Sequence, residues 1–189
     1  QVASDLGTGT ATMRLAPEEL DHDRQSLYAS LLSSRVAFSV VVFLVLWWSA
    51  RPIASLLTSD PNAGAIFVLV AANVLPLGIL GALGDQLRSE ERHTTLALLT
   101  TVSAVTESAL TVAWVVLRPG GIRGLVLARL CADLLVLLPF LIACRSTLRA
   151  RPRLEYVRRL LRLGVPIGAL YMLMLLRELD RYLIKIVLG

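Results

Sequence analysis

The chain has 189 residues, of which 56% are hydrophobic and 17% charged, with a formal net charge of +5 and a mean hydropathy of +0.69. Soluble domains are about a quarter charged and less apolar. Here the apolar residues form long runs, so composition excludes an ordinary soluble domain and favours an all-α polytopic membrane protein. The basic charge does not indicate a nucleic-acid partner, because no zinc finger, Gly-rich phosphate loop or basic-aromatic surface is present. Cys131 and Cys144 lack metal-ligand spacing, and we expect no metal and no cofactor.

Five segments are apolar over about the 20 residues that a helix needs to cross a bilayer core of about 30 Å. We predict membrane-spanning helices at about 33–57, 63–84, 94–117, 121–143 and 164–189. We expect prolines to bend these helices and glycines to let their backbones approach closely. The prolines are Pro76, Pro139 and Pro166, and the glycines are Gly78, Gly81 and Gly84. Because the chain begins at Gln1 and its last residues are apolar, we expect an interior part of a longer protein.

The arginines indicate which loops face the cytoplasm. If the spans alternate, twelve arginines fall in residues 1–35, 85–93 and 144–163, and only three fall on the opposite side. Cytoplasmic loops of membrane proteins carry the excess of Lys and Arg. We therefore predict that these three segments are cytoplasmic and that the net charge is mainly a signal of topology.

The segment 144–163 contains a second pattern. Leu154, Val157, Leu160 and Leu161 share one face of a predicted helix, and arginines occupy the other. An apolar face opposed by basic residues is typical of a helix that lies on a membrane surface. We predict a short amphipathic helix in this cytoplasmic loop.

The last predicted span carries five charged residues, namely Arg177, Glu178, Asp180, Arg181 and Lys185. Each charge at the centre of a span costs roughly 2.5–3.5 kcal/mol on an insertion scale. At 100° per residue all five fall within an arc of about 160°, so they occupy one face of the helix. This face is either an ion-pair network that joins helices or a cationic cavity wall. In the second case the three cations attract an anionic substrate, and Asp180 and Glu178 hold the arginines.

Two other spans contain charge. Glu107 lies on a polar stripe with Thr100, Ser103 and Thr111, and it is either a hydrogen-bonded structural carboxyl or a site that couples transport to a proton or cation. Arg129 and Asp133 are four residues apart on another span. We interpret them as a structural ion pair within one helix.

The stretch "LLRLGVPIGALYMLMLLRELDRYLIKIVLG" resembles the start of the second six-helix lobe of bacterial polysaccharide export flippases. That lobe begins after a basic loop with a Leu-Arg-x-Gly-x-Pro motif, followed by an Asp-Arg pair, a leucine and a glycine. The matching residues here are Leu161, Arg162, Gly164, Pro166, Asp180, Arg181, Leu183 and Gly189. The stretches "DLGTGTATMRLAPEELDHDRQ" and "LRSEERHTTLALLTT" are similar to two cytoplasmic connections of the first lobe.

The resemblance implies the multidrug, oligosaccharidyl-lipid and polysaccharide exporter superfamily, with two six-helix lobes around a central cavity. Residues 1–143 would be the second half of the N-terminal lobe, 144–163 the inter-lobe loop, and 164–189 the first helix of the C-terminal lobe. The function implied is movement of undecaprenyl-diphosphate-linked oligosaccharides across the bacterial cytoplasmic membrane by alternating access, not an enzymatic reaction. The implied partners are the lipid-linked sugar, the bilayer and polysaccharide polymerase machinery.

Two alternatives stay open. One is a multidrug or peptidoglycan-precursor exporter of the same fold. The other is a membrane-embedded glycan polymerase, ligase or glycosyltransferase, which would usually carry catalytic residues on a long external loop. The predicted external loops, near 58–63 and 118–122, are too short to hold such a site.

Overall fold

The described chain is helical and has no strand. The computed structural model describes residues 7–57, 63–117 and 121–170. Among these residues, four helices are long and apolar enough to cross a membrane, namely Asp23–Ser55, Gly64–Ser89, His93–Val115 and Gly121–Ala143. They coincide with four of the five predicted spans, whereas most of 164–189 lies outside the described residues. The predicted all-α polytopic membrane fold is confirmed.

The first described helices begin before the first predicted span. Helix α2 (Thr8–Leu15) leads through a 3-10 turn, η1 (Ala16–Glu18), into α3 (Asp21–Leu57). Helix α3 begins about twelve residues before the predicted span, and its 37 residues measure about 55 Å at 1.5 Å per residue. No Pro or Gly interrupts residues 21–35, so the helix continues through polar sequence, well past the thickness of a bilayer core.

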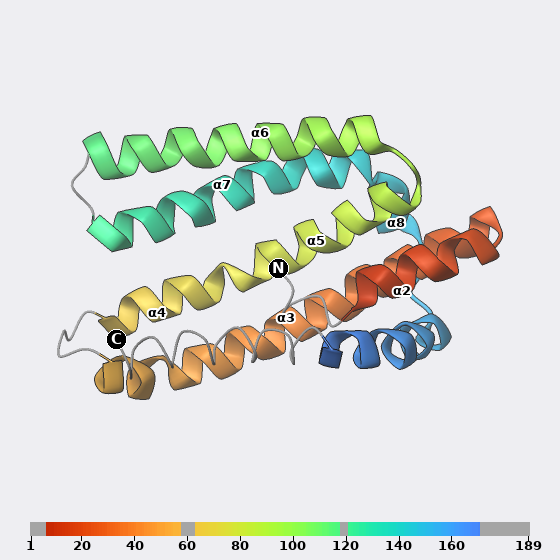
Figure 1. Ribbon diagram of the computed structural model, residues 1–189, viewed down its shortest axis with the longest axis horizontal. Helices are drawn as coiled ribbons and strands as arrows, with labels where there is room; N and C mark the ends of the chain where they lie inside the picture. The colour runs from red at the N-terminus through yellow and green to blue at the C-terminus, as the bar shows by residue number, and fades with distance from the viewer. Residues whose placement is uncertain (1–6, 58–62, 118–120, 171–189) are drawn as a thin grey trace.

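The second predicted span is built from two helices in succession, α4 (Ala63–Ala72) and α5 (Val74–Ser89). The interruption at Asn73 lies three residues before Pro76. Pro76 has no N–H to donate, and its ring clashes with the carbonyl of the residue four positions earlier, which is Ala72. The helix is therefore interrupted next to Pro76, while the predicted bend stays a prediction, and Figure 1 shows α4 and α5 as successive parts of one rod.

Helices α6 and α7 form an antiparallel pair beside this rod. Helix α6 (His93–Val112) ends in a π-helical turn, η2 (Ala113–Leu117), and α7 (Gly121–Ala143) returns and is followed by the short α8 (Arg145–Arg149). A last helix covers residues 154–170. Helix α7 packs on α6, α4 and α5, while α4 and α5 pack on α3, so the order across the bundle is α6, α7, α4–α5, α3 (Figure 1).

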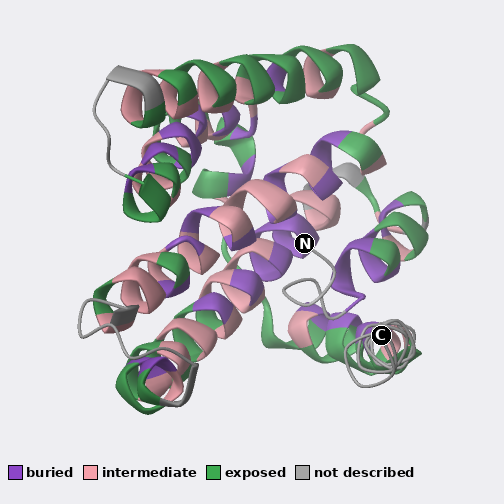
Figure 2. Ribbon diagram, turned by 60° about the vertical axis from the view of Figure 1, so that its left-hand side comes forward, coloured by how far each residue is buried: buried purple, intermediate pink, exposed green. Residues whose placement is uncertain are grey.

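Within the described residues, two apolar clusters hold one end of the bundle together. The first joins α2, α3, α5 and the last helix, and it contains Leu27, Tyr28 and Leu160. The second joins α5, α6 and α7, and it contains Leu87, Val136 and Phe140. Figure 2 shows the buried residues on the facing sides of the central helices, whereas most of α6 is exposed. Large apolar side chains remain exposed on the spans, as expected for helices that face lipid or further helices.

The last helix packs differently from the prediction. Its buried apolar side chains are Tyr156 and Leu160, which contact α2 and α3 through the first cluster, whereas Leu154 and Leu161 are exposed. The predicted apolar face is therefore divided between a packed stripe and the surface. Gly7 explains the close approach to α2, because a Cβ at this position would lie 2.5 Å from the Gly164 carbonyl oxygen and 2.8 Å from Ile167 Cβ. With φ of +68°, this position favours glycine in any case.

Candidate functional site

A cavity of about 370 Å³ opens between α3, α5, α6 and α7. This volume lies within the range of small-ligand sites. Apolar side chains line part of the wall, but the charged and hydroxyl groups give the cavity its character. The charged residues on the wall are Arg35, Asp85, Arg88, Glu107, Arg129 and Asp133, and the hydroxyl groups belong to Thr100 and Ser103.

A buried ion pair lies on the α3–α5 side of the cavity. The Arg35 guanidinium contacts Asp85 Oδ2 at 2.5 Å, and its Nε donates to Thr8 Oγ1 at 3.1 Å. The two charged side chains are only 5% and 10% exposed. A pair removed from water in this way is stable only when its hydrogen-bonding groups have partners. The short hydroxyl side chain of Thr8, on α2, supplies one of them.

Glycines on two helices make room for this pair. A Cβ at Gly81 would lie 2.6 Å from Arg35 Nη1, and a Cβ at Gly9 would overlap the Asp85 carboxylate. Gly78 does the same for Ser39 of α3, whose hydroxyl oxygen is buried without a hydrogen-bond partner. Gly78 and Gly81 of the second predicted span therefore face α3, where they admit polar side chains between the helices, whereas Gly84 lies nearest to Leu96 of α6.

Two further arginines reach the cavity from its more open parts. Arg88 contacts Asp85 Oδ1 at 3.4 Å with its side chain 55% exposed, and Arg129 is 51% exposed. An arginine presents up to five donors in a planar fork, which matches the oxygens of a phosphate or carboxylate. These two arginines can therefore meet an anion in the cavity without first leaving a buried pair.

The α6–α7 side of the cavity holds Glu107, Arg129 and Asp133. The predicted ion pair between Arg129 and Asp133 is not what the structure contains, because Arg129 Nη1 contacts Glu107 Oε1 of α6 at 3.6 Å instead. Asp133 is 5% exposed, and its Oδ2 atom has no hydrogen-bond partner. The physical reason is that α6 and α7 pack along their length, so a carboxylate on the neighbouring helix competes with the one four residues away.

The predicted polar stripe on α6 lies partly on the cavity wall. Thr100, Ser103 and Glu107 line the cavity, whereas Thr111 does not. The Thr100 hydroxyl donates back to its own helix, to the carbonyls of Leu96 and Ala97, both at 2.9 Å. Ion coupling at Glu107 stays a prediction. The five predicted cavity residues of the last span, Arg177, Glu178, Asp180, Arg181 and Lys185, lie outside the described residues.

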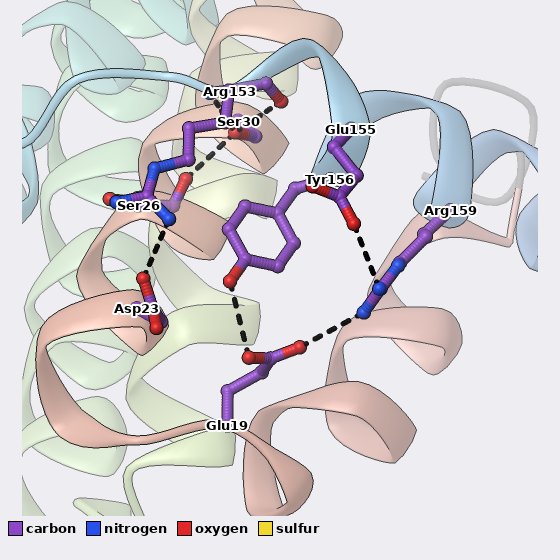
Figure 3. A network of polar contacts seen from close by, with 8 residues as sticks. All are labelled: Glu19, Asp23, Ser26, Ser30, Arg153, Glu155, Tyr156 and Arg159. Carbon is purple, nitrogen blue, oxygen red and sulfur yellow. Dashed lines mark hydrogen bonds and ion pairs between the residues drawn. The ribbon is translucent and has the colours of Figure 1, made fainter.

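A separate polar network fixes the last helix to the start of the bundle (Figure 3). The Tyr156 hydroxyl donates to Glu19 Oε2 at 3.1 Å, and Arg159 reaches Glu19 Oε1 at 3.2 Å. Arg153 Nη1 lies 2.7 Å from Asp23 Oδ1, and the Arg153 backbone N–H donates to Ser30 Oγ at 2.9 Å. Burial raises the pKa of the Tyr156 phenol, and its hydrogen bond to Glu19 raises it further. Residues more than 120 positions apart thus hold the last helix against η1 and α3.

Comparisons with known proteins point to one family. A search of curated proteins and a search of solved structures gave no match. The family model described as "Polysaccharide biosynthesis protein" matches residues 1–189, which is every residue of the chain. A match of this extent, on a chain whose helices can cross a membrane, shows that the chain belongs to the polysaccharide biosynthesis protein family.

Proposed function

We propose that this protein moves lipid-linked oligosaccharides, carried on undecaprenyl diphosphate, across the cytoplasmic membrane by alternating access. The observation that carries the proposal is the arginine-lined cavity between membrane-spanning helices in a member of a polysaccharide biosynthesis family. A diphosphate is the one strongly charged part of such a lipid. Arginine suits it because bidentate, charge-assisted hydrogen bonds are strong where water is scarce.

The cavity assigns roles to individual residues within this proposal. Arg88 and Arg129 are the half-exposed cations on its wall, so they would receive the diphosphate. Arg35 and Asp85 are buried together and would position Arg88, which contacts the other oxygen of Asp85. We further propose that Arg177, Arg181 and Lys185 extend this cationic surface, with Asp180 and Glu178 holding the arginines, in a second lobe that follows residue 163.

Membrane orientation is part of the proposal. With 1–35, 85–93 and 144–163 on the cytoplasmic side, the Asp85–Arg88 end of the cavity faces the cytoplasm, where the lipid-linked sugar is made. Single cysteines introduced at Glu90 and Arg151 should then react with an impermeant maleimide only after permeabilisation. Cysteines at Asn62 and Gly120 should react in intact cells, and the reverse pattern would contradict the orientation.

The test of the function is a matched pair of arginine variants of the full chain in cells that lack the native gene. Arg88→Gln removes a cavity cation, whereas Arg151→Gln removes an exposed cation outside the cavity. We expect Arg88→Gln to lower surface polysaccharide about tenfold or more, as loss of one charge-assisted contact predicts, and to leave lipid-linked sugar on the cytoplasmic leaflet. Arg151→Gln should behave as wild type. Equal export by both variants, at equal expression, would show that the cavity cation takes no part in transport.

A further inference from the structure

The Arg129 cluster contains more carboxyl groups than cations. It contains one guanidinium, on Arg129, and two carboxyl groups, on Glu107 and Asp133. Arg129 contacts Glu107. Asp133 lines the cavity but is only 5% exposed. Its Oδ2 atom has no hydrogen-bond partner. An ionised carboxylate in this position would have neither water nor a partner at that oxygen.

The cluster also lies deep within the predicted bilayer core. Asp133 is ten residues from the cytoplasmic end of α7 at Ala143, which is about 15 Å at 1.5 Å per residue, or half of a core of about 30 Å. Glu107 lies fourteen residues from the start of α6 at His93, and Arg129 lies fourteen residues from Ala143. The midplane is where an uncompensated charge is least favourable.

We infer that Asp133 is a proton-binding site, and that its protonation depends on whether Arg129 contacts Glu107 or Asp133. With Arg129 on Glu107, as in this structure, the proton stays on Asp133 and the cluster is neutral. If Arg129 turned to Asp133, four residues away on its own helix, the aspartate would release the proton and Glu107 would take one up. A proton fits better than an alkali ion because it needs one oxygen atom, whereas a hard cation needs a shell of about six.

The other charged groups on the cavity wall pair with one another and not with Asp133. From α5 these are Asp85 and Arg88, and from α3 Arg35, and these three residues form their own ion pairs. Helix α4, which also packs on α7, contributes no titratable residue. The inference goes beyond the proposed function, because it concerns proton binding and can be measured in the absence of any lipid-linked sugar.

Labelling with N,N′-dicyclohexylcarbodiimide tests the site directly, since this apolar reagent adds to protonated carboxyl groups within membranes. The full chain is purified in lipid nanodiscs, labelled between about pH 6 and pH 9, and mapped by mass spectrometry. We expect Asp133 to be labelled, with labelling falling about tenfold per pH unit once its proton is lost. Asp85, buried but paired with Arg35, is the matched control and should stay unlabelled.

Two variants test the role of Arg129 in opposite directions. Glu107→Gln releases Arg129 to Asp133, where its charge favours the carboxylate, so labelling of Asp133 should fall about tenfold or more at a fixed pH. Arg129→Gln removes the shared cation, so labelling should appear at Glu107 and persist at Asp133. A misfolded variant is recognised because Asp85 also becomes labelled.

Three results would overturn the inference. The first is a wild-type protein in which Asp133 is labelled no more than Asp85 at about pH 6. The second is a Glu107→Gln variant in which Asp133 labelling is unchanged while Asp85 stays protected. The third is protection of Asp133 by Na⁺, but not by choline, at constant pH, which would assign the compensating charge to an alkali ion.

Discussion

Replacing Asp85 by Asn tests how strongly the buried ion pair supports the fold. Both side chains of the Arg35–Asp85 pair are at most 10% exposed, and they meet at 2.5 Å. Removing one member of a buried pair costs about 3–5 kcal/mol, because the other charge remains buried. An asparagine oxygen can still accept one hydrogen bond, so we expect the lower end, about 3 kcal/mol, which is about two decades in the unfolding equilibrium.

The last helix supplies a matched surface control. Glu155 and Arg159 meet at 2.8 Å, but their side chains are 70% and 51% exposed. Glu155→Gln should therefore cost only about 0.3–0.5 kcal/mol, as measured for solvated pairs four residues apart on a helix. The assay is denaturant unfolding of each variant of the full chain in the same detergent, followed by tryptophan fluorescence. Equal losses for the two variants, or a loss below about 1 kcal/mol for Asp85→Asn, would refute the reasoning from burial.

Three further predictions concern other parts of the chain. Tyr156→Phe keeps the buried ring but removes the hydrogen bond to Glu19, so we expect the free energy of unfolding to fall by about 1 kcal/mol in the same assay. An unchanged free energy of unfolding would show that this hydrogen bond does not stabilise the fold. Burial raises the pKa of the Cys144 thiol from 9.0 to about 11. Because the folded state holds this proton more tightly, the contribution of the protonated thiol to the free energy of unfolding is complete below about pH 9 and is lost as the pH rises towards 11. The unfolding midpoint should therefore fall more steeply between about pH 9 and 11 in the wild type than in Cys144→Ala. Arg181→Ala should reduce transport without reducing expression if Arg181 binds substrate, and recovery of transport on adding Asp180→Ala would instead identify a structural ion pair.

The spans could be predicted from sequence because a bilayer core imposes a length and an apolar composition that are visible residue by residue. Helix ends were less predictable. Helix α3 continues through residues 21–33 because nothing there breaks a helix, and polarity alone does not end one. The interruption at Asn73 follows from Pro76, whose effect on backbone hydrogen bonding is local.

The partners in the cavity could not be predicted in the same way. Arg129 has a carboxylate four residues away, at Asp133, yet contacts Glu107 on another helix. Which contact forms depends on how α6 and α7 are rotated against each other, and no local rule determines that. Arg35 and Asp85 are fifty residues apart, and their one sequence signal is the glycine spacing of α5. That spacing predicts close backbone packing but does not indicate a buried ion pair.

The most direct test of the central claim is the leaflet distribution of a lipid-linked sugar in proteoliposomes that contain the full chain. A fluorescent undecaprenyl-diphosphate oligosaccharide is incorporated, and the fraction that dithionite quenches reports the molecules in the outer leaflet. The account predicts that wild-type protein makes both leaflets accessible, whereas Arg88→Gln slows this about tenfold or more and Arg151→Gln does not. Equal quenching in vesicles with wild-type protein and in protein-free vesicles, with the protein folded and inserted, would contradict the claim that this chain translocates the lipid.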